Sequence, residues 1–296
     1  SRIVFIGKNY GDAYEVEVAT GDMKNITTNL PHQGLHRIQY LPNGDFLVTA
    51  PRIYKGANTR ADLEMWVLDK SLNKSLQPLG EKPLEGIAIS KKRNLIAWTA
   101  SAPGVTLQKG EPWQILFNKP TTRYIADISY HNGSPSISNK REIMAELPNA
   151  CHFIEPQDFR DNDNELVFSC LHFSGQNGMQ VSVMGYKLDS GKYITYRSQP
   201  DEYNEVEGLS LDGDWATVEC GKQNKPGIPP LEICLLELKP NGAITRLFTG
   251  TPEGVLDEMS NPVVSPDGKW VAFQKSARSG TEYGEGLGLY IVKIAE

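Results

Sequence analysis

The sequence has 296 residues, of which 39% are hydrophobic, and a formal net charge of −6 at pH 7. Because binding to phosphate backbones needs clustered Lys and Arg, this acidic balance argues against nucleic acid as the main partner. The sequence contains no run of about 18 apolar residues, so we expect no membrane span.

The 27 Gly and 19 Pro favour many short strands and tight turns over helices. The chain opens with Ser-Arg-Ile-Val-Phe-Ile, which has the composition of a strand and lacks an initiator Met. We therefore expect that an upstream segment has been removed.

Short apolar runs separated by turn residues predict strands along the whole chain, in six consecutive groups. Group by group, the predicted strands are 2–7, 13–19 and 23–27; 36–40, 46–50, 63–69 and 75–79; 86–90, 95–99, 124–130 and 142–145; 151–154, 165–170, 180–188 and 193–196; 207–211, 215–220, 232–238 and 244–248; and 262–265, 270–275 and 288–294.

One hairpin sequence recurs in these groups. Residues 261–274 read N-P-V-V-S-P-D-G-K-W-V-A-F-Q, two apolar runs around a Pro-Asp-Gly turn. Similar phrases occur at 208–218 and, more loosely, at 38–48 and 87–98, and a copy with a longer turn spans 153–168. Hairpins that return every ~50 residues are typical of a radial array of four-stranded blades. The phrase resembles the repeated element of TolB-type β-propellers.

The resemblance implies an all-β fold, a β-propeller with six blades of four-stranded antiparallel sheets that forms a single domain over residues 1–296. The first group lacks an inner strand and the last group lacks an outer one. An insertion at 103–122 is too long for a simple hairpin loop. Its Trp113, Leu116 and Phe117 favour packing over one face, and the alternative is an Ω-loop that shields a blade edge.

In the propeller geometry that the resemblance implies, inner strands start at one rim of the central channel and second strands end at that rim. The residues at or just before inner-strand starts are His36, Glu85, His152 and Glu207. The residues at the ends of second strands are Arg52, His172, Lys222 and Arg278.

These positions predict a site at the rim of the channel. The candidate catalytic residues are His36, Glu85, His152, His172 and Glu207, and the candidate ligand-binding residues are Arg52, Trp113, Lys222 and Arg278. Converging imidazoles and carboxylates can bind a divalent metal ion or transfer protons. Their spacing matches no metal-binding motif. The alternative is that His36 and His152 are hydrogen-bonded polar residues around a wet channel.

Two segments, Leu35-His36-Arg37 and Ala150-Cys151-His152-Phe153, also resemble the scattered metal-binding His residues of the oligogalacturonate lyases, which have TolB-like propellers. This second resemblance implies that His36 and His152 hold a divalent metal ion. It also implies the activity of a metal-assisted polysaccharide lyase or hydrolase.

The oxygen-rich segment 160–165, R-D-N-D-N-E, lacks the Gly and closing Glu of an EF-hand loop. We predict a solvated turn there, with a calcium site as the alternative. No G-x-S-x-G sequence is present, so a serine hydrolase of the α/β type is not supported.

The four cysteines predict two local disulfides. Alignment of the fourth strand group on the sixth sets Cys151 opposite Cys170 across a hairpin, at an expected Cα separation of ~5.5 Å. Cys220 aligns with Cys170, and Cys234 enters the strand that follows, so these two residues form the second pair. Two disulfides indicate a secreted or periplasmic protein, and the alternative is a cytoplasmic propeller with reduced thiols.

Three functions are consistent with these features. The first is a secreted or periplasmic propeller that binds a saccharide or peptide ligand at the channel mouth. The second is a metal-assisted polysaccharide lyase or hydrolase that uses the same His and Glu residues. The third is a protein–protein interaction scaffold, which predicts contacts on the blade edges or on the opposite face.

Overall fold

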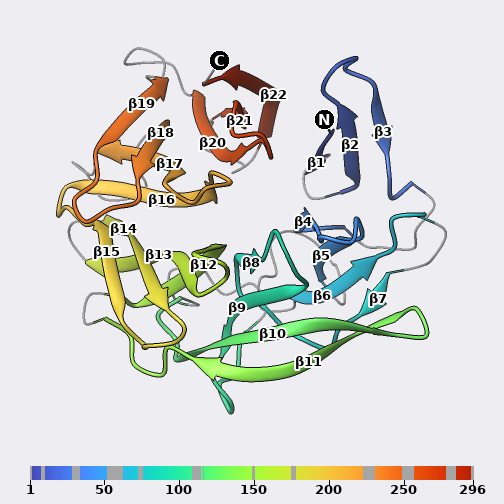
Figure 1. Cartoon of the computed structure of the whole chain (residues 1–296), viewed down its shortest axis with the longest axis horizontal. Helices are drawn as coiled ribbons and strands as arrows, with labels where there is room; N and C mark the ends of the chain where they lie inside the picture. Colours follow the sequence, from blue (N-terminus) through green and yellow to red (C-terminus); the bar gives the residue numbers. More distant parts are fainter. Residues whose placement is uncertain are drawn as a thin grey trace. The chain divides into compact units, whose positions relative to one another are not determined.

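The computed structural model describes residues 2–7, 11–28, 34–51, 63–72, 76–108, 115, 117–148, 151–174, 178–222, 231–248, 257–277 and 285–294. The elements in these ranges are all β-strands, as the sequence predicted. The chain divides into two compact units, Ser1–Ala145 and Glu146–Glu296. Within each unit, consecutive strands pair as antiparallel meanders (Figure 1). No helix in the described ranges has the length and apolar content needed to cross a membrane.

The first unit contains three antiparallel sheets. The first sheet consists of β1 (Arg2–Ile6), β2 (Ala13–Glu17) and β3 (Met23–Asn25). The second consists of β4 (Arg37–Tyr40), β5 (Phe46–Pro51), β6 (Leu63–Leu68) and β7 (Gln77–Pro78). The third consists of β8 (Ile87–Ile89), β9 (Leu95–Ser101), β10 (Thr121–His131) and β11 (Ser134–Ile143).

The second unit contains three further meanders. One consists of β12 (Phe153–Arg160), β13 (Glu165–Ser174), β14 (Gly178–Lys187) and β15 (Tyr193–Arg197). The next consists of β16 (Glu202–Leu209), β17 (Trp215–Lys222), β18 (Glu232–Glu237) and β19 (Ile244–Phe248). One parallel pair, Val181 of β14 with Tyr203 of β16, joins these two into an eight-stranded sheet. The last sheet consists of β20 (Asp257–Val264), β21 (Trp270–Ala277) and β22 (Glu285–Lys293).

The predicted strands occur in the predicted order, and several of their boundaries differ from the prediction, two of which matter for the site and the turns. The fourth strand of the third group, predicted at 142–145, is β11 and begins at Ser134. Asn132 and Gly133, with φ of 50° and 75°, form a two-residue turn that returns the chain directly along β10. The strand predicted to begin at 207 is β16, which begins at Glu202. Six blades and a single domain stay predictions.

The insertion at 103–122 is closed at its base. The backbone N–H of Ala102 donates to the carbonyl of Pro120 at 3.0 Å, and the ammonium of Lys119 donates to the carbonyl of Thr106 at 2.9 Å. Phe117 is buried, as expected for a segment that packs on the fold. Trp113 and Leu116 lie outside the described residues.

The repeated hairpin phrase has a hydrogen-bonding basis, which is clearest in the turn from β20 to β21. The Ser265 hydroxyl donates to the Asp267 carboxylate and accepts the backbone N–H of Trp270 at 3.0 Å. Gly268 takes a φ of 70°, which favours glycine. The pKa of Asp267 is lowered, first by the Ser265 hydroxyl and then by the Lys269 backbone N–H. The turn at 210–215 repeats these bonds between equivalent residues.

The two meanders of the eight-stranded sheet repeat each other residue for residue along their first strands. In β12, Gln157 is left out of the pairing with β13, and in β16, Glu207 is left out of the pairing with β17. Each is a β-bulge, which adds one residue to a strand and redirects the side chains around it. Beyond the bulges, inward-facing side chains of these meanders form one buried cluster that includes Val167, Val183 and Val206.

Both predicted disulfides are present. Cys151 and Cys170 have Cα atoms 5.3 Å apart, and Cys220 and Cys234 have Cα atoms 6.0 Å apart. The predicted register of the first pair was wrong, because Ile154 lies opposite Cys170 and Cys151 precedes β12. The second pair is diagonal between β17 and β18, since Cys220 lies opposite Glu232.

A buried carboxylate, that of Glu165 at the start of β13, joins several strands of the second unit. It lies 3.0 Å from the Lys187 ammonium and 3.8 Å from the Arg160 guanidinium, and it accepts the Tyr196 hydroxyl. Lys187 also contacts Asp161 at 2.6 Å. An ammonium group therefore lies among the acidic oxygens of the 160–165 turn, which weighs against the calcium site. Asp163 and Glu165 are buried, so the turn is only partly solvated.

Replacement of Gly185 by Ala should destabilise the second unit. A Cβ at Gly185 would overlap the Glu165 carboxylate and crowd the Tyr196 ring. Overpacking of this kind costs about 1–3 kcal/mol. Urea denaturation measures the loss, with Gly208→Ala as the control, because a Cβ there has its nearest neighbour at 3.4 Å. Equal stability of the two variants would contradict the packing around Glu165.

A second prediction concerns the redox state of the four cysteines. Protein purified without reductant should have an intact mass lower by four hydrogen atoms than the reduced chain, because two bridges form. Each bridge should add ~3 kcal/mol to the free energy of unfolding, so reduction should lower the urea midpoint. Four free thiols in material never exposed to reductant would contradict both bridges.

Candidate functional site

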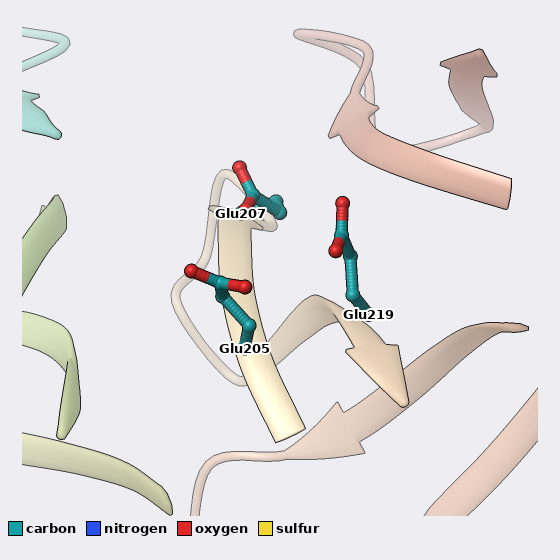
Figure 2. Close-up of side chains that lie close together, drawn as sticks. All are labelled: Glu205, Glu207 and Glu219. Atoms are coloured by element: carbon teal, nitrogen blue, oxygen red, sulfur yellow. The ribbon is translucent and has the colours of Figure 1, made fainter. Parts of the chain in front are cut away.

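Three carboxylates converge on one side of the second unit. Glu205 and Glu207 lie on β16 and Glu219 lies on β17, and each offers an oxygen atom within 4.8 Å of the others. Figure 2 shows the three side chains close together, two on β16 and one on β17. Glu205 and Glu219 are directly opposite each other in the antiparallel pair. Like charges opposite each other destabilise a sheet, so this arrangement favours a bound positive charge or a shared proton.

Neutral donors hold two of these carboxylates in place. The Tyr203 hydroxyl donates to Glu205, and the backbone N–H of Asn261 donates to Oε1 of Glu219 at 2.6 Å. Asn261 has a φ of 53° at an irregularity of β20, which turns its N–H toward β17. Burial of Tyr203, followed by the charges of Glu205 and Glu219, raises its pKa well above 10. Tyr203 therefore remains a hydrogen-bond donor at neutral pH.

Strand β12, which is the counterpart of β16 in the preceding meander, carries polar side chains at equivalent positions. Gln157 takes the bulge position in β12 that Glu207 takes in β16, and it is only 6% exposed. Its Nε2 has no hydrogen-bond partner among the described residues. The two strands are tied together by the backbone N–H of Leu209, which donates to Asp158 at 3.3 Å. The first strands of both meanders thus present polar side chains at matching positions.

This arrangement of oxygen atoms suits a cation. A Lys or Arg side chain donates several charge-assisted hydrogen bonds to carboxylates, and Arg does so with fixed geometry. Hard divalent cations such as Ca²⁺, Mg²⁺ and Mn²⁺ also prefer carboxylate oxygens. The group formed by Glu205, Glu207 and Glu219 is called the acidic triad below.

His152 and His172, both among the predicted site residues, lie together. Their ring centroids are 4.7 Å apart and the rings are nearly parallel, at 19°. The backbone N–H of Phe173 donates to Nδ1 of His152 at 2.9 Å. A neutral imidazole with Nδ1 as acceptor carries its proton on Nε2, so neither nitrogen of His152 offers a free lone pair to a metal ion. The geometry weighs against the predicted metal-binding role of His152.

Two predicted site residues belong to the first unit. Glu85 is buried and forms an ion pair with Arg37 at 2.8 Å. His36 is half-buried, and its backbone N–H donates to the carbonyl of Thr49 at 2.7 Å. His152, His172 and Glu207 belong to the second unit. The predicted convergence of all five residues in one pocket stays a prediction.

Of the four predicted ligand-binding residues, the structure describes only Lys222. Lys222 is exposed at the end of β17, and its ammonium lies 3.6 Å from Asp201. Arg52, Trp113 and Arg278 lie outside the described residues, so their roles stay predictions.

Glu207 was among the site residues predicted from the sequence, whereas Glu205, Glu219 and Tyr203 were not. The inner strand was predicted to begin at 207, so Glu205 fell outside it, whereas Glu207 lies near the end of β16. The available signal was the Glu-Val-Glu sequence at 205–207, which places two acids two residues apart in a strand.

No family model and no curated protein matches this sequence. The solved structure of a putative TolB from Agrobacterium tumefaciens is similar, with a TM-score of 0.63 and 13% identity over 96% of this chain and 84% of that one. The structure of TolB from Acinetobacter baumannii has a TM-score of 0.59 and 12% sequence identity, over 94% of this chain and 61% of that one. The structure of an oligogalacturonate lyase from Vibrio parahaemolyticus has a TM-score of 0.54 and 11% sequence identity, over 99% of this chain and 71% of that one.

At these identities the likeness concerns the fold alone. The structures share the arrangement of antiparallel meanders that the repeated hairpin phrase predicted. The chain therefore has the fold of the TolB-like β-propellers.

Proposed function

We propose that this protein is an exported β-propeller that binds a peptide ligand through a basic side chain held by the acidic triad. The observation that carries the proposal is the approach of three carboxylates to within 4.8 Å of one another. A guanidinium or ammonium group would offset the repulsion between Glu205 and Glu219 and form charge-assisted hydrogen bonds with them. A neutral saccharide brings no such charge, so the triad favours a peptide among the predicted ligands.

The two disulfides support the exported part of the proposal. Structural disulfides persist in oxidising compartments and are rare in the cytosol. Both bridges lie within single meanders and join neighbouring strands or their flanking residues. A secreted or periplasmic location is consistent with this, and a cytoplasmic location would leave four thiols in the interior of the second unit.

Peptide binding can be tested with a panel of fluorescent peptides that differ only in charge. Peptides with Arg or Lys should bind the native protein more tightly than peptides with Glu at the same positions. Glu205→Gln and Glu219→Gln should weaken binding of the basic peptides by roughly thirtyfold, since removal of one partner of a buried charge pair costs about 2 kcal/mol or more. Fluorescence anisotropy gives the Kd values.

Glu237→Gln is the matched control for these variants. Glu237 lies at the end of β18, is exposed, and pairs with Lys239 at 2.6 Å. It should bind the basic peptides like the native protein. Equal affinity for basic and acidic peptides, or no effect of Glu205→Gln, would contradict the proposed ligand class.

A second candidate function rests on the same triad as a divalent-cation site in a polysaccharide lyase or hydrolase. Glu205, Glu207 and Glu219 would hold the ion, since three carboxylates fit the ligand preference of Ca²⁺ or Mn²⁺. Such an ion would supply a Lewis acid for a polysaccharide carboxylate or glycosidic oxygen. The triad fits this role better than His152, whose Nδ1 is already engaged.

Cation binding and peptide binding predict different thermal shifts. If the triad is a cation site, Ca²⁺ or Mn²⁺ at about 100 times its Kd should stabilise chelator-treated protein by about 2.7 kcal/mol and raise Tm. A triple Glu→Gln variant of the triad should show no such shift. An unchanged Tm in the native protein would rule out the cation site, and the peptide panel would then decide alone.

A further inference from the structure

The acidic triad has a counterpart in the preceding meander of the second unit. Glu155 lies opposite Ser169 in the pair of β12 with β13, as Glu205 lies opposite Glu219 in the pair of β16 with β17. Gln157 takes the bulge position that belongs to the third acid of the triad. The three residues Glu155, Gln157 and Ser169 are called the counterpart set below.

One hydrogen bond shows that the counterpart set lies beside the triad. The backbone N–H of Val206 donates to Oγ of Ser169 at 2.9 Å, and Val206 lies between Glu205 and Glu207 in β16. The same bond recurs at the next boundary, where the backbone N–H of Asn261 donates to Glu219 at 2.6 Å. Each meander therefore contacts the first strand of the next one in the same way, at the bulge.

The two sets differ in charge. The triad has three carboxylates, whereas the counterpart set has one, and Gln157 and Ser169 are neutral. Burial first, then the charges of Glu205 and Glu219, and last that of Glu155, raise the pKa of Tyr203. Neutral amide and hydroxyl groups bind neutral polar atoms by ordinary hydrogen bonds. The triad thus suits a cationic group, and the set beside it suits the uncharged polar part of the same ligand.

Gln157 supplies a donor for such a polar part. Its side chain is only 6% exposed, and its Nε2 has no hydrogen-bond partner among the described residues. A buried donor without an acceptor costs stability, so a ligand that brings an acceptor gains the hydrogen bond. Every residue of a peptide carries such an acceptor, its backbone carbonyl, close to its side chain.

We propose that Gln157 is a ligand-binding residue, which donates from Nε2 to the backbone carbonyl of the basic residue whose side chain the acidic triad holds. The inference rests on the proposed peptide function and gives that site its specificity. A simple organic cation such as a polyamine satisfies the carboxylates alone. An Arg or Lys residue within a peptide satisfies the carboxylates and Gln157 together.

Two small probes separate these contributions. N-acetylarginine amide and N-acetylagmatine each carry one guanidinium group, and only the first has a carboxamide at the position of the peptide carbonyl. NMR titration of ¹⁵N-labelled protein gives both Kd values. N-acetylarginine amide should bind the native protein about fivefold more tightly, as expected for one net hydrogen bond. In Gln157→Met, which keeps an unbranched side chain without the donor, this preference should disappear while the affinity for N-acetylagmatine stays the same.

Gln180→Met is the matched control. Gln180 lies on β14 of the same unit, is half-buried, and donates from Nε2 to the carbonyl of Gln199 at 3.0 Å. This variant should keep the native preference for N-acetylarginine amide. Without ligand, Gln157→Met should melt at the native Tm or above it, because it removes a buried donor that has no partner among the described residues.

The outcomes distinguish Gln157 from the triad. Equal affinity of the native protein for both probes, a preference that survives in Gln157→Met, or a lower Tm of that variant would overturn the role of Gln157. If Gln157→Met does not fold, the comparison of the two probes on the native protein still decides. Binding of both probes that Glu205→Gln weakens would leave the proposed function standing in each of these cases. If neither probe binds the native protein, the proposed function fails, and this inference fails with it.

Discussion

Antiparallel pairing between the first two strands of each meander is the interaction on which the other features depend. A turn with a Ser hydroxyl, an Asp carboxylate and a left-handed Gly closes the pair at 210–215 and 265–270. In β12 and β16 a bulge then interrupts the pairing at equivalent residues. The turn fixes the register and the bulge sets where side chains point beyond it. Through these two devices the repeat places Glu205 and Glu219 opposite each other.

The second unit holds its buried and half-buried carboxylates by two different kinds of contact. Glu165 contacts Lys187 and Arg160, so its charge is compensated within the fold. The donors to Glu205 and Glu219 include a Tyr hydroxyl and a backbone N–H, which orient the carboxylates without supplying a full positive charge. A set of acids whose oxygens approach one another to within 4.8 Å and are oriented by such donors resembles a binding site more than a structural ion pair. This contrast supports the proposal that the acidic triad binds the ligand.

The sequence was sufficient for strand order and the all-β fold, because period-two alternation and the Ser-Pro-Asp-Gly turn are local signals. It also predicted both disulfide pairs, although the register assumed for Cys151 and Cys170 was wrong. The sequence did not predict the features that depend on a shift of the strand register by one residue. The bulge at Glu207 hid the true start of β16, and with it the place of Glu205. The Asn132-Gly133 turn moved β11 by eight residues from its predicted start at 142. The His152–His172 contact was predicted only as a shared rim, and the Phe173 hydrogen bond has no sequence signature.

The position of the cysteines has a consequence for how the chain matures. All four belong to the second unit, and the first unit, Ser1–Ala145, contains none. The bridges span 19 and 14 residues, so each can form as soon as its own hairpin has emerged. The strand pairing of the amino-terminal half therefore involves no thiol, whereas the carboxy-terminal half needs an oxidant to complete its bridges. During maturation of the chain, thiol oxidation would therefore act on the second unit alone.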